Sequence, residues 1–229
     1  KKTKKDNLSK MLFTVGIKVP KEVLDVVDSG IIIRENQSEH KEMNWVSFVP
    51  LIGGSSIGSK KATGVPPIAT LSYSDFDKND CHLRAYWDNV PHLHWDKAED
   101  VNYFKSLCAG KEIDFVTTIC PCAGLSSLNV SKSRGSDAKQ NHWIKETAMV
   151  ALKEIKPKVF WGENAPELFM KDGNDLVDKL REIGREYGYS FSMVKTNTEL
   201  HGVPQRRIRT FYFFWRSPSV PFLDWKRIA

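Results

Sequence analysis

Two hydrophobic patterns alternate along the chain. Short runs of β-branched and apolar residues are typical of buried strands, and longer stretches whose apolar residues recur every three or four positions are typical of helices. The first pattern predicts seven strands, over residues 45–52, 68–73, 92–95, 114–119, 159–162, 189–195 and 208–215. The second pattern predicts helices over residues 77–87, 99–107, 143–155 and 176–187. Because strands alternate with helices, we expect an α/β fold in which a mostly parallel seven-stranded sheet carries helices on both faces.

The first part of the chain departs from this regular alternation. Residues 1–44 begin with lysines and continue as a weakly amphipathic stretch, in which residues 21–27 are expected to form a helix and residues 31–33 a short strand. Short terminal segments usually dock on a larger domain. We therefore expect a basic N-terminal appendage over residues 1–44 and one α/β domain over residues 45–229.

Composition indicates a soluble protein with a preference for anionic partners. The chain has 229 residues, of which 41% are hydrophobic and 27% charged, and its net charge is +6. Its four cysteines lack the spacing of a disulfide framework or of a zinc site, so we expect a reducing cytoplasmic setting and no metal. No stretch suits a membrane span, and the start lacks the apolar core of a signal peptide. The chain begins with Lys1, which suggests a trimmed protein or part of a longer one.

The strand expected over residues 114–119 leads to the first candidate for chemistry. Pro121 ends this strand because proline has no N–H for the sheet, and Cys122 follows on the turn. Open α/β sheets place reactive groups at the carboxyl ends of their strands. Cys122 is therefore a candidate nucleophile, with a small buried hydrophobic residue as the alternative.

The ends of the first two expected strands carry residues suited to a nucleotide-like ligand. Gly53 and Gly54 allow a tight turn and a close approach of the backbone to a ligand, although a simple turn is as good an explanation. Asp75 has the position from which an acid binds a ribose diol, and Phe76 beside it is suited to stack on a purine. The alternative is that Asp75 is solvated and that Asp77 caps the following helix.

The last two constellations supply an acid and a group of basic residues. Glu163 ends the strand expected next to that of Cys122, and partial burial would raise its pKa enough for it to donate a proton at neutral pH. The alternative is an acid at a helix N-terminus. Gln205, Arg207 and Arg209 lead into the last strand, where alternation puts them on one side as a clamp for a base or phosphate. A solvent-facing basic edge strand is the alternative.

Taken in order, these motifs resemble those of the DNA cytosine-5 methyltransferases. The resemblance covers roughly residues 45–215 and implies a Rossmann-like class I methyltransferase fold that uses S-adenosyl-L-methionine as cofactor. It rests on the five motifs Gly53-Gly54, Asp75-Phe-Asp-Lys78, Pro121-Cys122, Glu163-Asn164 and Gln205-x-Arg207-x-Arg209. Where the family usually has Phe-x-Gly-x-Gly, this chain has Val49-Pro-Leu-Ile-Gly53.

The resemblance also implies a set of residues that hold the cofactor. The loop from Val49 through Gly53 to Gly54 would hold the methionine part. Asp75 would bind the ribose hydroxyls and Phe76 would lie beside the adenine. Asp96 and Pro121 complete the cofactor-binding set, with Asp96 near the adenine amino group.

The remaining motifs imply a catalytic set and a partner. Cys122 would be the nucleophile that adds to C6 of cytosine, and Glu163 the acid at the flipped base. Double-stranded DNA is the implied partner, because the target atoms lie inside the duplex and the base must flip out. Arg207 and Arg209 would support the active site. The implied DNA contacts are Gln205 and, from a mobile loop over residues 126–140, Ser126, Lys132 and Arg134.

The resemblance leaves three questions open. The target recognition region that normally follows is not in this chain, so it would come from a second chain or from a missing segment. An RNA cytosine-5 methyltransferase and a catalytically silent regulatory subunit that binds the cofactor or DNA are the alternatives. A nicotinamide oxidoreductase is weakly supported because the glycine fingerprint is incomplete. In a prokaryotic or phage setting the protein would associate with the nucleoid.

Overall fold

A seven-stranded sheet forms the centre of the structure. The computed structural model describes residues 43–78, 89–126 and 138–216, all within one compact unit. The strand order is β3-β2-β1-β4-β5-β7-β6. Among the described strands, β7 is antiparallel to both of its neighbours, β5 and β6, whereas the other neighbouring pairs are parallel. The strands are β1 (Trp45–Phe48), β2 (Ala69–Ser72), β3 (His92–His94), β4 (Phe115–Thr118), β5 (Val159–Asn164), β6 (Ser190–Asn197) and β7 (Ile208–Trp215). This confirms the predicted α/β fold with a mostly parallel sheet.

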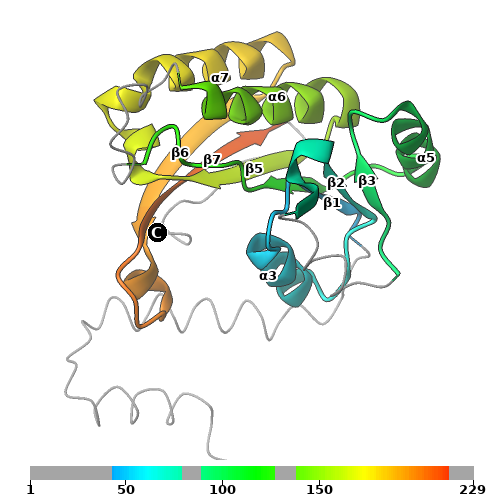
Figure 1. The fold of residues 1–229 in the computed structure, drawn as a ribbon, viewed down its shortest axis with the longest axis horizontal. Helices are drawn as coiled ribbons and strands as arrows, with labels where there is room; N and C mark the ends of the chain where they lie inside the picture. Colours follow the sequence, from blue (N-terminus) through cyan, green and yellow to red (C-terminus); the bar gives the residue numbers. More distant parts are fainter. Residues whose placement is uncertain (1–42, 79–88, 127–137, 217–229) are drawn as a thin grey trace, which may run out of the picture. The chain divides into compact units, whose positions relative to one another are not determined.

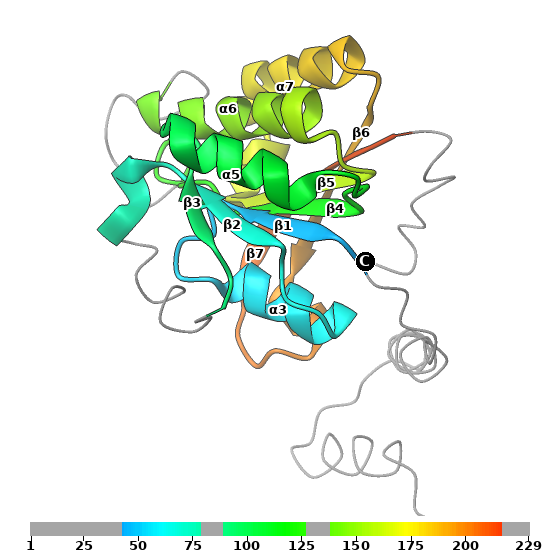
Figure 2. The same cartoon turned by 90° about the vertical axis from the view of Figure 1, so that its right-hand side faces the viewer.

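Helices pack on both faces of this sheet (Figure 1). On one face lie α5 (Ala98–Cys108), α6 (His142–Val150) and α7 (Asn174–Glu186), and on the other lies α3 (Gly54–Thr63), as Figure 2 shows. A π-helical turn, Ala151–Ile155, continues α6, and Lys156 ends it in a left-handed conformation. No helix in the described part of the chain combines the length and the apolar character needed to cross a membrane.

Two expectations from the sequence are wrong in their boundaries or their element. The first strand ends at Phe48 rather than at residue 52, because Val49 and Leu51 both have positive φ angles and leave the extended conformation. Helix α3 occupies a stretch where no helix was expected. Three expected segments lie outside the described residues: the helix over residues 21–27, the strand over residues 31–33, and residues 79–87 of the helix expected over residues 77–87.

Close packing between β5 and β7 requires glycine at one position in the middle of the sheet. Gly162 pairs with Tyr212 across these strands, and both are buried. A Cβ atom at Gly162 would lie 2.3 Å from the Tyr212 hydroxyl oxygen and 2.7 Å from the Thr118 methyl carbon. Only glycine fits here without displacing the tyrosine ring, so this contact sets how closely β4, β5 and β7 pack just before the residues that carry the candidate chemistry.

Candidate active site

The candidate residues gather because parallel strands end at one edge of the sheet. Phe48 of β1 pairs with Thr118 of β4, which in turn pairs with Gly162 of β5. The segments that leave these three strands therefore start side by side. They carry the glycine turn, Cys122 and Glu163, as the order of motifs along the sequence predicts.

Cys122 begins a single helical turn that packs against the core. The backbone N–H groups of Leu125 and Ser126 donate to the carbonyl oxygen of Cys122 at 3.0 and 2.9 Å. Leu125 is buried and anchors the turn, while Cys122 is half-buried. Gly124 lets the turn approach the next segment, since a Cβ there would lie 2.6 Å from Asn141 Oδ1. The thiol thus sits on a backbone that several contacts hold.

The second cysteine of this loop has a different environment. Cys120 is buried, and its sulfur lies 3.4 Å from Thr118 Oγ1 and 3.3 Å from Thr147 Oγ1. Burial raises the pKa of the Cys120 thiol to about 11, although the hydrogen bonds with the two threonines act in the opposite direction. A thiol of this kind stays protonated and packs as a small apolar residue. Cys122 is therefore the better candidate nucleophile of the two.

An ion pair places Glu163 beside the arginines of the last motif. Arg209 Nε lies 2.6 Å from Glu163 Oε1, and the two side chains are 20% and 17% exposed. Burial raises the pKa of the Glu163 carboxyl above its ordinary value, while the charges of Arg209 and Arg207 act against that rise. The net direction is upward, as expected for a carboxyl that donates a proton.

A buried amide connects the end of β5 to the candidate nucleophile loop after β4. Asn164 Nδ2 donates to the carbonyl oxygen of Cys120 at 3.4 Å, and the N–H of Ala165 donates to Asn164 Oδ1 at 2.9 Å. Asn164 is fully buried. Its side chain thus joins the residue after Glu163 to the backbone two residues before Cys122. The sequence motif contains Asn164, but spacing alone gives no sign of this role.

The turn after β1 has glycine-like φ angles at two residues that are not glycine, Val49 and Leu51. The φ angles of Val49, Leu51 and Gly53 are 46°, 50° and 88°. The Val49 N–H donates to Leu71 O at 2.7 Å, and the Gly53 N–H donates to Pro50 O at 2.9 Å. Leu51, which stands where the family usually has glycine, adopts the left-handed conformation that glycine favours.

The two candidate acids for the cofactor lie at the ends of neighbouring strands β2 and β3. Asp96 accepts the backbone N–H of Ser74 at 3.1 and 3.3 Å through its two oxygens. Burial acts to raise the pKa of Asp96, but the hydrogen bonds from Ser74 lower it below the ordinary value. Asp75, next to Ser74, is exposed. Phe76 is buried and contacts the Trp143 ring, with the centroids 4.9 Å apart.

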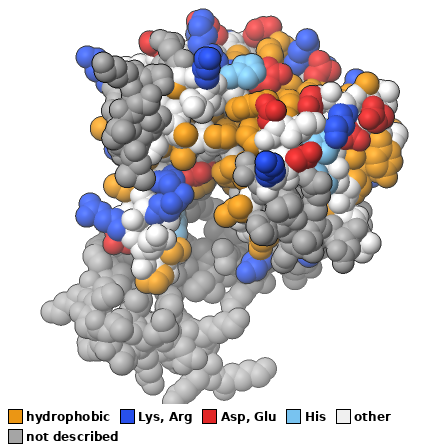
Figure 3. Space-filling model, in the orientation of Figure 1, with side chains coloured by type: hydrophobic (Ala, Val, Ile, Leu, Met, Phe, Trp, Pro, Cys, Tyr) orange, Lys and Arg blue, Asp and Glu red, His pale blue; other side chains and the backbone are white. Residues whose placement is uncertain are grey.

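The candidate DNA contacts are only partly described. Gln205 and Arg207 are exposed on the segment that precedes β7, where basic side chains gather (Figure 3). Strand β7 begins at Ile208. The alternation of faces expected from the sequence therefore applies to Arg209, whereas Gln205 and Arg207 lie before the strand. Ser126 is half-buried and donates its N–H to the Cys122 turn. Lys132 and Arg134 lie outside the described residues.

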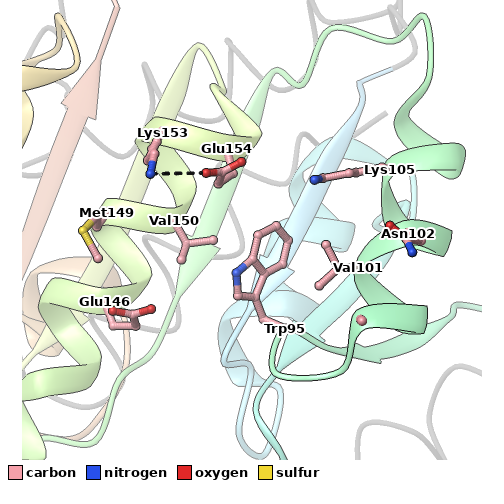
Figure 4. A pocket seen from close by; sticks show the side chains of 10 residues that line it. Trp95, Val101, Asn102, Lys105, Glu146, Met149, Val150, Lys153 and Glu154 are labelled. Carbon is pink, nitrogen blue, oxygen red and sulfur yellow. Dashed lines mark ion pairs between the residues drawn. The ribbon is translucent and has the colours of Figure 1, made fainter.

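A groove of about 490 Å³ lies between α5 and α6 (Figure 4). Trp95 lies in the middle of the view, with Lys105 on the α5 side and Glu146 on the α6 side. Lys153 and Glu154 form an ion pair at its margin, 3.7 Å apart. Trp95 directly precedes Asp96, so the groove begins beside the candidate adenine acid. The sequence pattern gave no sign of this groove because its residues come from two separate helices.

Known structures with a similar fold are methyltransferases. A DNA modification methyltransferase encoded within an E. coli prophage matches with a TM-score of 0.63 and 18% identity, over 80% of this chain and 49% of its own. The Entamoeba histolytica methyltransferase EhMeth matches with a TM-score of 0.55 and 14% identity, over 80% and 56%. The S. pombe Dnmt2 methyltransferase matches with a TM-score of 0.51 and 13% identity, over 76% and 49%. The chain thus spans about half the length of these proteins.

The family is established by sequence rather than by these structural likenesses. None of the curated proteins compared matches the sequence. The profile of the C-5 cytosine-specific DNA methylases, however, matches residues 43–222, which include every candidate site residue named above. The chain therefore belongs to the family of C-5 cytosine-specific DNA methylases.

Proposed function

We propose that this protein methylates C5 of cytosine in DNA and that Cys122 and Glu163 carry the chemistry. The observation that supports this most is the link between the end of β5 and the loop after β4. Asn164, next to Glu163, holds the backbone of Cys120, two residues before Cys122. A thiol and a carboxyl that must act on one pyrimidine ring need such a fixed relation, because small errors in position lower the rate steeply.

The proposed roles follow from the reactivity of cytosine. The C5 carbon is a weak nucleophile, so the Cys122 thiolate adds to C6 and forms a C–S bond. Glu163 gives a proton to N3, and the electron pair of the ring becomes available at C5. After the methyl group has been transferred to C5, a base removes the C5 proton and the C–S bond breaks, which restores the thiolate. N3 returns its proton to Glu163, and the ring is aromatic again. The raised pKa of Glu163 supports its role as the proton donor.

The residues present fit the expected cofactor, S-adenosyl-L-methionine, which supplies the methyl group when bound. The turn from Val49 to Gly53 has the left-handed backbone expected for the loop that would hold the methionine part. The exposed carboxylate of Asp75 suits the two hydroxyls of a ribose. Asp96, held by Ser74, suits an adenine amino group. Phe76 would meet the adenine only with the part of its ring that Trp143 leaves uncovered.

The proposed partner is double-stranded DNA. The exposed Arg207 and the basic side chains around it suit phosphate contacts, which supply most of the affinity for DNA. Because the chain spans about half the length of its structural relatives, we propose that another segment or a second chain reads the target sequence. The proposed setting is the cytoplasm, with association to the nucleoid in a prokaryotic or phage context.

Duplex DNA that carries 5-fluorocytosine tests this proposal. Fluorine at C5 cannot leave as a cation, so an enzyme that works through Cys122 stays covalently attached after methyl transfer. We expect a denaturation-resistant adduct with the wild type and with Cys108→Ser, a matched substitution of a half-buried cysteine at the end of α5. Cys122→Ser should give no adduct while it keeps its cofactor affinity. An adduct with Cys122→Ser would remove this residue from the mechanism.

Transfer of tritiated methyl groups to DNA and to RNA, measured side by side, separates the proposal from its alternatives. Label in DNA alone supports a DNA methyltransferase. Label in RNA alone would replace the proposed substrate with RNA. Calorimetric binding of the cofactor without label in either nucleic acid, also after addition of a protein that supplies target recognition, would support a silent subunit instead.

A further inference from the structure

Two histidines and an aspartate meet at the edge of the sheet, outside the residues assigned to methyl transfer. His92 and His94 lie two residues apart on the edge strand β3, so they share one face, and Asp77 follows the end of β2. One ligand atom from each of the three side chains lies within 4.8 Å of the other two. From the spacing of its cysteines, we expected no metal site in this chain. The sequence shows the two histidines of β3, but only the structure brings Asp77 beside them.

Further side chains orient both imidazole rings toward this point. His94 Nδ1 lies 3.1 Å from Asp100 Oδ2, and His94 Nε2 lies 2.5 Å from Asp77 Oδ1. His92 Nδ1 lies 2.6 Å from Thr70 Oγ1 on the neighbouring strand β2. Histidines that bind metals usually hold their second ring nitrogen in this way, with a carboxylate or another polar group. Asp100 also accepts the backbone N–H of His94 at 2.8 Å, so its position is fixed by two contacts.

The donor set suits one class of cation. Two imidazole nitrogens and one carboxylate oxygen form a three-ligand set of the kind that binds Zn²⁺ with a fourth position for water. Mg²⁺ and Ca²⁺ prefer sets made of oxygen alone. The His94 side chain is 9% exposed and that of Asp77 is 42% exposed, so the site is both shielded and reachable from solvent.

The surrounding carboxylates are also compatible with a cation. Asp77 and Asp100 bring two carboxylates to His94, and the Nζ of Lys97 lies 3.3 Å from His94 Nδ1. In tetrahedral coordination, ligand atoms lie about 3.3 Å apart. His94 Nε2 and Asp77 Oδ1 would thus separate slightly as the cation replaces the hydrogen between them.

We propose that Asp77, His92 and His94 form a binding site for a divalent transition-metal cation of the zinc class. A bound cation joins the segment after β2 to the edge strand β3, beside the contact between Ser74 and Asp96. The site is independent of methyl transfer, so it stands or falls separately from the proposed function.

Calorimetric titration of the chelator-treated full chain with Zn²⁺ tests the site. We expect one equivalent to bind the wild type, and Mg²⁺ not to compete at equal concentration. His92→Asn and Asp77→Asn should each weaken Zn²⁺ binding at least tenfold. His201→Ala, which removes an exposed histidine bound to Thr196 at the end of β6, should bind as the wild type does. Unchanged affinity in both site variants, or no binding to the wild type, would overturn the proposal.

Two further measurements identify the ligands and the role of Asp100. Co²⁺ in place of Zn²⁺ should give the absorption of a tetrahedral site with nitrogen and oxygen ligands, whereas a sulfur charge-transfer band would assign the cation to cysteines and overturn the proposal. Asp100→Asn should weaken binding roughly 10–100-fold if Asp100 holds His94 as a positioning residue. The rise in melting temperature with Zn²⁺ should be present in His201→Ala and absent in Asp77→Asn.

Discussion

The side-chain amide of Asn164 donates a hydrogen bond to the main-chain oxygen of Cys120, 3.4 Å away, and thereby joins the end of β5 to the loop after β4. Both groups are buried. The thiol-bearing turn and the carboxyl therefore do not move independently, and Asn164 is a positioning residue for the proposed reaction. The same side chain accepts the N–H of Ala165, so its orientation is determined at both ends.

Replacing Asn164 by alanine should lower kcat for methyl transfer at least tenfold while KM for DNA changes little. The reason is that the distance between the thiol and the carboxyl is no longer fixed, whereas the DNA-facing residues are unchanged. Buried groups left without partners should also cost about 1–3 kcal/mol of unfolding free energy. Steady-state kinetics and urea unfolding check both effects. Asn174→Ala, an exposed change at the start of α7, is the control, and a larger KM with unaltered kcat in Asn164→Ala would contradict the role.

Gly162→Ala should destabilise the protein because the new methyl group would overlap the Tyr212 ring. We expect a loss of about 1–3 kcal/mol, as for other overpacked cores, and a fall in melting temperature of roughly 2–4 °C for each kcal/mol. Gly58→Ala is the matched control, because a Cβ there meets no atom within 4 Å and the residue lies in α3. That variant should gain about 0.5–1 kcal/mol. Equal melting temperatures for the two variants would show that the Tyr212 ring moves aside without a cost in stability.

The raised pKa of Glu163 predicts the direction in which the free energy of unfolding changes with pH. Between the ordinary carboxyl pKa of 4.5 and the raised value in the folded state, the folded protein binds more protons than the unfolded chain. Stability contributed by this group is therefore present at low pH and is lost as the pH rises through that window. The free energy of unfolding of the wild type should fall relative to that of Glu163→Gln over the same window. Urea unfolding at a series of pH values measures it, and the opposite slope would mean that Arg209 dominates.

Leu51→Gly should keep or improve cofactor affinity, because glycine adopts the φ angle of 50° without a steric penalty. Leu51→Val should weaken it, since β-branched residues fit the left-handed region poorly. Calorimetry with S-adenosylhomocysteine compares the two. Ile52 is the control position, because it is 73% exposed and has no positive φ. If the changes at Leu51 and Ile52 have the same effect, backbone conformation at Leu51 does not govern binding.

Helix α3 shows where hydrophobic periodicity fails. Its sequence, from Gly54 to Thr63, contains two glycines, and its one fully buried residue is Ser56. The hydroxyl of Ser56 lies 2.5 Å from that of Ser47 inside the protein, so a polar contact with β1 attaches the helix to the sheet. Such a contact depends on tertiary structure and leaves no apolar stripe in the sequence. Strands β1 and β2, whose apolar and β-branched runs are buried on both faces, were predictable for the opposite reason.

The candidate site divides in the same way. The positions of Cys122 and Glu163 followed from the rule that functional groups stand at the carboxyl ends of parallel strands. The ion pair between Glu163 and Arg209 did not follow, because it depends on how β7 pairs with β5. The burial of Phe76 against Trp143 was likewise hidden, since the two lie on separate elements far apart in the chain. Order along the sequence thus locates the site, and pairing between distant elements determines its charges.

The place of β7 between β5 and β6 has a consequence for biosynthesis. Ile208–Trp215 is made after its neighbours on either side, yet it must enter between them. While the ribosome is still adding these residues, β5 and β6 have no shared partner, and Glu163 lacks the arginine that neutralises it. In a nascent chain Glu163 is therefore made before Arg209, and the proposed site is complete only when β7 has entered the sheet.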